Sequence, residues 1–443
     1  LVIPGCSLEH ILDFPKKAKK FVGLGKLCDV LIACRVSPSQ KAKLVRVVRK
    51  YANVDEEKIG GDTQEEPMTL AIGDGANDVG MILEAHLGVG ISGKEGMQAV
   101  NNSDFAIAQF RFLRRLLLIH GRWSYLRTAK VFLYSFSKNV ALVFTLFFFA
   151  TDSAFSGQSL YTSWLYAGYN FYLGMPIIAV GFLTKDISSE SVLKVPQLYA
   201  TGRLNMLLSL ESMVEWVVMG FLYAFVVYFV GRRTGQEVEG FESFGTRVLF
   251  CLIVMMQVKV VRITDTFTVV SGYFQAFSWL LFFSSVAILD YIPWFLNTDN
   301  MRGVFVDVFL SWDTYMYIII VAGIMEIVEL VKEHLRLQYR PNAIDIIKEI
   351  DSGVLATESG RERVARRSSI VLEQRANRGG ATGPVAEAVE ETVDSVAKLL
   401  SSQHILQPRS SYAYDHPSMF SHSKKKSIVN RRRSFGRGKN SWG

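Results

Sequence analysis

The chain has 443 residues, of which 49% are hydrophobic and 20% are charged, and its formal net charge is +8 at pH 7. Its mean hydropathy of +0.21 is high, and the apolar residues gather in long blocks between about 131 and 331, which favours a membrane protein with polar ends. The basic residues collect at the ends of these blocks and in the tail, not in one stripe beside aromatic side chains, which argues against nucleic-acid binding. The four cysteines have no CxxC spacing, so neither a disulfide framework nor a zinc site is predicted.

Residues 1–115 predict an α/β segment in which strands and helices alternate. Short apolar runs bounded by turn residues predict strands, and longer stretches with apolar residues at helical spacing predict helices. Such alternation is typical of a parallel sheet with helices on its faces. The predicted strands are Val30–Cys34, Thr69–Ile72, Gly88–Ile91 and Phe105–Ala108, and the predicted helices are Gln40–Tyr51 and Val79–Leu87.

Residues 116–340 predict a membrane domain of six helices, since about 20 apolar residues cross a bilayer core. The fourth has the weakest signal, because Gln257 and Lys259 interrupt it after a short apolar run. Basic residues favour cytoplasmic flanks, and their distribution places both ends of this domain in the cytoplasm, with Arg232 and Arg233 as the exception. The predicted spans are about 131–150, 161–183, 211–231, 246–264, 273–296 and 314–331.

Residues 341–443 predict a basic cytoplasmic tail that begins with a short helix over Pro341–Asp351 and is otherwise mostly disordered. Arginine clusters stand beside serines at Arg366–Ser369 and Arg431–Ser434. Two interpretations are open: a solvated tail near anionic lipid, or a contact with membrane or pump that phosphorylation weakens.

The segment Thr69–Asp78, with the sequence TLAIGDGAND, is an apolar strand that ends in a glycine-flanked acidic turn. Asp74 and Asp78 can converge on a hard cation such as Mg²⁺, which prefers oxygen ligands. Gly73 and Gly75 allow a tight turn and close approach to a phosphate. The alternative is a structural turn in which Asp78 only caps the following helix.

The segment Cys34–Lys41, with the sequence CRVSPSQK, follows another predicted strand. Lys41 opens a helix there and can reach the same sheet edge, where its charge would neutralise a phosphoryl group. Arg35 could serve similarly. Lys43 and Arg46 are expected to form a solvated helix face.

Together, GDGxND and the preceding SPxQK segment resemble the haloacid-dehalogenase-like (Rossmannoid) phosphorylation domain of P-type ATPases. Further motifs resemble the P4 subclass, the phospholipid flippases, and the resemblance extends from Leu1 to about Asp351. These motifs are RVSP at Arg35–Pro38, GVGISGKEG at Gly88–Gly96, SDFAIAQFRF at Ser103–Phe112 and HGRWSY at His120–Tyr125.

The resemblance implies roles for individual residues of the first segment. Asp74 and Asp78 would form the Mg²⁺ site, and Lys41 would contact the phosphoryl group. Arg35, Asn77 and Asp78 would lie near bound nucleotide or phosphate. The implied reaction uses ATP to phosphorylate an aspartate, and phospholipid entry stimulates hydrolysis of that phosphoenzyme.

In the membrane, the resemblance implies a lipid path along the first two predicted spans. Lys138, Asn139, Asn170 and Pro176 match family positions there, with Pro176 expected to break its helix. An ionisable residue at this depth is costly, which favours a functional role for Lys138. The alternative is a lysine that extends to the membrane interface. These two spans contain no carboxylate, which favours a lipid route over the ion site of a cation pump.

The implied cargo is phosphatidylserine or phosphatidylethanolamine, moved from the exoplasmic to the cytoplasmic leaflet. A two-span glycosylated accessory subunit is an implied partner, and plasma membrane and endomembrane are both open. The sequence contains no DKTGT segment, so we expect a partial phosphorylation domain from a longer polypeptide, with no ATP hydrolysis by this chain alone. The alternatives are a phosphatase head on a membrane anchor and a non-catalytic, partner-binding paralogue.

Overall fold

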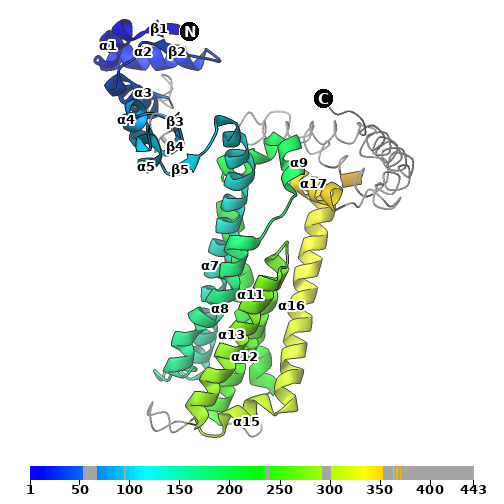
Figure 1. Ribbon diagram of the computed structural model, residues 1–443. Helices are drawn as coiled ribbons and strands as arrows, with labels where there is room; N and C mark the ends of the chain where they lie inside the picture. Colours follow the sequence, from blue (N-terminus) through cyan, green and yellow to red (C-terminus); the bar gives the residue numbers. More distant parts are fainter. Residues whose placement is uncertain are drawn as a thin grey trace, which may run out of the picture. The chain divides into compact units, whose positions relative to one another are not determined.

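The computed structural model describes residues 1–52, 67–93, 96–234, 240–291 and 301–352, together with Arg363, Arg366, Arg367 and Ile370. The chain divides into two compact units, Leu1–Leu117 and Leu118–Gly443 (Figure 1). Each unit is described by itself.

The first unit contains two parallel sheets. Strand β1 (Val2–Pro4) pairs with β2 (Ile32–Cys34), with Val2 opposite Ile32. The second sheet has the order β3 (Leu70–Gly73), β4 (Leu87–Ile91) and β5 (Phe105–Ile107). Helices connect successive parallel strands, as parallel pairing requires. They are α1 (Gly5–Leu12), α2 (Pro15–Lys26), α3 (Pro38–Tyr51), α4 (Val79–Glu84) and α5 (Gln98–Asn101), followed by α6 (Leu113–Arg115).

The predicted strands of this unit are found, but one predicted helix ends too late. Helix α4 stops at Glu84, because Ala85 has an extended backbone, and Leu87 begins β4 with its amide bonded to the carbonyl of Thr69. Helices α1 and α2 and strand β1 were not predicted. The reason is that β1 is only three residues long and α2 carries lysines along most of its surface.

The second unit is built from six helices that are long and apolar enough to cross a membrane (Figure 1). Together with the parallel α/β unit, they confirm the predicted fold class for the described residues. The predicted end of the fifth span, after Tyr291, lies outside the described residues. The six are α7 (Arg122–Asp152), α8 (Ser163–Leu183), α11 (Leu210–Thr234), α12 (Phe241–Ile263), α13 (Val269–Tyr291) and α16 (Trp312–Tyr339).

Helix α12 is the most enclosed of the six. In its most apolar window 78% of the residues are buried, against 22% to 44% in the other five helices. The predicted fourth span is therefore present, as α12. Gln257 and Lys259 interrupt its apolar run because they are buried among other helices, where polar partners replace lipid.

Short helices lie at the two ends of this bundle. Helix α15 (Val304–Phe309) is at one end, and α9 (Ser189–Lys194) and α17 (Ala343–Asp351) lie together at the other (Figure 1). Buried Ile346 and Ile347 of α17 pack in a cluster with Trp123 and Val192, and Ser188 and Ser191 donate hydrogen bonds to Asp351. The predicted helix after Pro341 is thus present, whereas most of the predicted tail lies outside the described residues. The remaining short elements are α10 (Ala200–Arg203) and the turns η1 (Ala76–Asp78), η2 (Phe110–Phe112), η3 (Leu116–Gly121) and η4 (Pro196–Tyr199).

Candidate functional site

A lysine and an aspartate meet at the carboxyl ends of β2 and β3. Lys41 Nζ lies 2.7 Å from Asp78 Oδ1, and the two side chains are 34% and 15% exposed. Lys41 is held in the first turn of α3, where Ser37 and Gln40 form a reciprocal capping box and Pro38 opens the helix. The local sequence therefore fixes the start of α3, and with it the position from which Lys41 reaches Asp78.

Asp78 is placed by the tight turn that follows β3. A Cβ atom added to Gly73 would lie 2.3 Å from Cβ of Asp78, so the aspartate packs against bare backbone at this point. Its side chain makes no capping hydrogen bond with α4, which contradicts the interpretation of Asp78 as a simple helix cap. The close approach of the Asp78 side chain to the backbone therefore requires a glycine at position 73.

The other predicted residues of this site lie at the same ends of the strands. Asp74 and Asn77 are exposed in the turn after β3, and Asp74 packs beside Gly93. Arg35 is exposed after β2 and adopts a φ of 53°, and its carbonyl lies 2.4 Å from a Cβ added to Gly5. The structure thus joins Lys41 directly to Asp78 and leaves Asp74, Asn77 and Arg35 accessible around them.

The chemistry of these side chains fits a single Mg²⁺ ion. Asp74, Asp78 and Asn77 offer carboxylate and amide oxygens, the ligand type that Mg²⁺ takes, and two carboxylates leave positions for water and phosphate. In the part of the chain that the structure describes, no group of three or more His, Cys, Asp or Glu side chains that could hold a metal ion is found.

The remaining basic residues of α3 pair elsewhere. Lys43 lies 2.9 Å from Asp13, and Arg46 makes two hydrogen bonds with Glu84. The hydrogen bonds from Arg46 lower the pKa of Glu84; burial opposes this shift, and the charges of Arg46 and Arg49 add to it. Both side chains thus belong to a solvated helix face, as predicted.

In the second unit, Lys138 of α7 turns toward α8. Its ammonium group donates a hydrogen bond to Asn170 Oδ1 and lies 5.5 Å from the centre of the Tyr169 ring. The Tyr169 hydroxyl donates to the carbonyl of Lys138 at 2.9 Å. Only 5% of Lys138 is exposed, so it does not extend along the surface to the membrane interface. Asn139, the next residue, is exposed beside this contact.

Pro176 does not break α8, which corrects the sequence-based expectation. The helix is continuous from Ser163 to Leu183. Proline removes the amide that would bond the carbonyl four residues earlier, and Ser278 of α13 donates to that carbonyl, on Tyr172. Gln257 of α12 in turn donates to Ser278 Oγ at 2.5 Å. A neighbouring side chain therefore satisfies the group that proline leaves unpaired.

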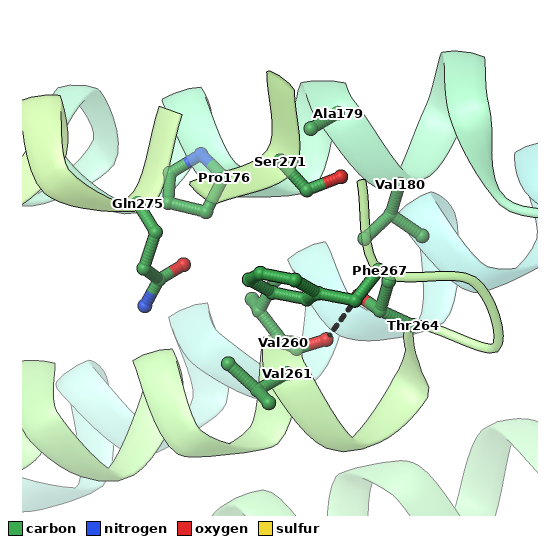
Figure 2. Close-up of a pocket in the computed structure, with 9 residues that line it drawn as sticks. All are labelled: Pro176, Ala179, Val180, Val260, Val261, Thr264, Phe267, Ser271 and Gln275. Carbon is green, nitrogen blue, oxygen red and sulfur yellow. Dashed lines mark hydrogen bonds between the residues drawn. The ribbon is translucent and has the colours of Figure 1, made fainter. Parts of the chain in front are cut away.

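Pro176 also lines a small hollow between α8, α12 and α13. Figure 2 shows Phe267 pointing into it between Pro176 and Val260. Sequence reasoning identified neither the polar chain from Gln257 to Tyr172 nor this hollow. The other lining residues are Ala179, Val180, Val261, Thr264, Ser271 and Gln275.

Comparison with known proteins identifies the family. Residues 100–342 match the family model described as phospholipid-translocating P-type ATPase C-terminal. The chain is 37% identical over 314 residues to the human probable phospholipid-transporting ATPase IM, covering 69% of this chain and 25% of the relative. It is 33% identical over 367 residues to human phospholipid-transporting ATPase ID, covering 79% of this chain and 29% of the relative.

A plant protein gives the same result. The chain is 40% identical over 303 residues to probable phospholipid-transporting ATPase 5 of Arabidopsis thaliana, covering 66% of this chain and 24% of the relative. The chain thus spans about a quarter of the length of these relatives. With a family model matched over more than half of its residues, this chain belongs to the phospholipid-translocating P-type ATPases and corresponds to their C-terminal region.

Proposed function

We propose that this chain is the C-terminal part of an ATP-driven, Mg²⁺-dependent phospholipid flippase that works through an aspartyl-phosphate cycle. It would move phospholipid, with phosphatidylserine or phosphatidylethanolamine as the first candidates, from the exoplasmic to the cytoplasmic leaflet. The six candidate spans and the basic residues at their ends support an orientation with both ends in the cytoplasm. The same proposal includes a two-span glycosylated accessory subunit. The protein would reside in the plasma membrane or in an endomembrane.

The single observation that carries this proposal is the contact between Lys41 and Asp78 at the ends of β2 and β3. Phosphoryl transfer depends on positioning and on neutralising negative charge. Lys41 would hold a phosphoryl oxygen, while exposed Arg35 and Asn77 would orient bound phosphate or nucleotide. Asp74 and Asp78 would hold Mg²⁺, which supplies charge neutralisation when bound.

The open arrangement of the sheets supports a phosphorylation domain that is completed by another segment. In the described residues, β1–β2 and β3–β4–β5 form separate parallel sheets, although α3 and α4 pack against each other. An unpaired strand edge leaves backbone N–H and C=O groups without hydrogen-bond partners, which another strand can supply. We propose that a strand ending in the phosphorylated aspartate inserts between β1 and β3, and that this chain alone does not hydrolyse ATP.

The membrane contacts support a lipid path along α7 and α8. Lys138 and Asn170 offer a cation and an amide, which suit a phosphate headgroup, and Asn139 is exposed beside them. Pro176 and its hollow lie further along α8. A lipid headgroup would compete with Asn170 for the ammonium group of Lys138.

The test uses the longest polypeptide encoded with this chain, with accessory subunit where required. We expect Asp74→Asn to abolish phosphoenzyme formation from ATP, and Lys138→Met to raise the phospholipid concentration needed for half-maximal stimulation. Glu84→Gln, at an exposed ion pair of the same unit, serves as the control and should retain activity. Phosphoenzyme formation by Asp74→Asn at the wild-type level would refute the role of Asp74 in the site. Absence of phosphoenzyme in the wild type would refute the proposed function and favour a non-catalytic, partner-binding protein.

A further inference from the structure

A second buried lysine lies inside the bundle, away from the Lys138 contact with α8. Lys259 of α12 is 4% exposed, and its ammonium group lies 3.6 Å from Glu329 Oε1 on α16. The ring centres of Trp216 and Tyr223, both on α11, lie 4.6 and 4.8 Å from the Lys259 ammonium nitrogen. One cation is thus enclosed by a carboxylate and two aromatic faces.

Glu329 is balanced from several sides. The Tyr223 hydroxyl donates to its Oε1 at 3.3 Å, and Lys332 lies 3.2 Å from its Oε2. Lys332 also contacts Glu215 at 3.0 Å. We call these six residues, Glu215, Trp216, Tyr223, Lys259, Glu329 and Lys332, the Lys259 cluster. Its charges sum to zero, and this balance offsets part of the free-energy cost of burying Lys259 in a low-dielectric interior.

Among the described residues, one hydrogen bond joins the Lys259 cluster to α7. Lys259 Nζ donates to Ser137 Oγ at 3.4 Å, and Ser137 is fully buried. The next residue is Lys138, whose side chain faces α8. Helix α11 approaches closely on the same side, since a Cβ added to Gly220 would lie 2.7 Å from the carbonyl of Ser137. This turn of α7 is therefore held by α11 and α12 on one side and by α8 on the other.

An ionisable pair at this depth costs free energy, and apolar side chains of the same size would stabilise the bundle as well. We infer that Lys259, balanced by Glu329, is a positioning residue that fixes the α7 turn at Ser137 and so sets phospholipid affinity at Lys138. The inference rests on the proposed function. Lys259 acts through Ser137 and does not itself contact the lipid.

The experiment measures ATP hydrolysis of the full-length protein against phospholipid concentration in mixed micelles. The variants are Ser137→Ala, the pair Lys259→Met with Glu329→Gln, and all three changes together. Removing both charges avoids leaving one buried and unpaired, so this variant should fold. We expect Ser137→Ala and the paired variant each to raise the half-maximal phospholipid concentration about threefold or more, with kcat little changed. The triple variant should show no further rise, because all three changes break one link.

A matched control is available between the same two helices. Arg262 of α12 lies 2.7 Å from Glu326 of α16, and Arg262→Met with Glu326→Gln removes that pair without touching Ser137. Its half-maximal phospholipid concentration should stay at the wild-type value. A general loosening of α12 against α16 would instead shift this control as much as the Lys259 variant.

The outcomes separate the two claims. Absence of phospholipid stimulation in the wild type would refute the proposed function. If phospholipid stimulates the wild type and the folded paired variant keeps the wild-type half-maximal phospholipid concentration, the inference is overturned. Additive effects in the triple variant would also overturn it. If the paired variant does not fold, Ser137→Ala decides alone, and a wild-type value there overturns the inference.

Discussion

The buried ion pair between Arg122 and Asp186 allows a quantitative test of the second unit. Two hydrogen bonds of 2.7 and 2.6 Å join the guanidinium group to the carboxylate, and the side chains are 2% and 0% exposed. Removing one partner of such a pair costs about 3–5 kcal/mol, because the other charge stays buried. Lys348 lies 4.0 Å from the same carboxylate and would compensate in part. We therefore expect Arg122→Met to cost about 3 kcal/mol, near the lower end of that range.

The assay is thermal unfolding of the detergent-solubilised protein, followed by intrinsic fluorescence. Replacing both partners, as Arg122→Met with Asp186→Leu, should recover most of the loss, since well-packed apolar residues can replace a buried pair. Lys43→Met, which removes an exposed ion pair with Asp13, should change stability little. A loss below about 1 kcal/mol for Arg122→Met would refute the reasoning, since that is the range of exposed pairs.

The same pair predicts how this loss depends on pH. Burial tends to raise the pKa of Asp186, but the hydrogen bonds and charge of Arg122, with Lys348, lower it below its usual 3.8. A lowered pKa stabilises the fold above the unfolded pKa, and this contribution is lost only as pH falls through the folded value. In the Arg122→Met variant the raising effect of burial is opposed mainly by Lys348, so the pKa of Asp186 rises and the destabilisation should be at least as large at pH 8 as at pH 6. A larger destabilisation at pH 6 than at pH 8 would contradict the assignment of the wild-type carboxylate as fully ionised.

Four further substitutions test local packing. Gly73→Ala places a methyl group 2.3 Å from Cβ of Asp78, so we expect phosphoenzyme formation in the full-length protein to fall at least about tenfold, measured with labelled ATP. Gly245→Ala brings Cβ within 2.1 Å of a backbone carbonyl in the loop between α7 and α8 and should destabilise by about 1–3 kcal/mol. Gly323→Ala, with open space around it, should instead gain up to about 1 kcal/mol in the same thermal assay. Ile347→Asp should release α17, which is detected as faster amide exchange over residues 343–351, whereas Ile347→Val should not.

The first unit was predicted best where short-range sequence determines the backbone. Apolar runs bounded by turn residues located β3 and β4, and the GDG turn located Asp74 and Asp78. Lys41 was predicted to reach the sheet edge that carries the GDG turn, and it lies 2.7 Å from Asp78, although β2 and β3 belong to separate sheets in the described residues. The boundary between α4 and β4 could not be predicted, since Leu87 suits either element and its pairing with β3 decides.

The contacts within the membrane unit were harder to predict, because they join residues far apart in the sequence. Pro176 was expected to break α8, and only the structure reveals Ser278, about a hundred residues later, at the unpaired carbonyl. The partner of Lys259 is likewise on α16. The sequence could have indicated that such partners exist, because each buried polar residue within an apolar span requires one.

This requirement gives polar interruptions of an apolar span a structural meaning. Gln257 and Lys259 interrupt the apolar run of α12, yet α12 is the helix most enclosed by its neighbours. A lipid-facing helix cannot keep such side chains without cost, whereas an interior helix can pair them with Ser278 and Glu329. Hence the interruptions that weaken the signal for a span also indicate its place in the bundle. If this reasoning holds, Lys259→Leu should raise the hydropathy of α12 but lower the stability of the bundle, because Glu329 would stay buried with one of its two ion-pair partners, Lys259, removed.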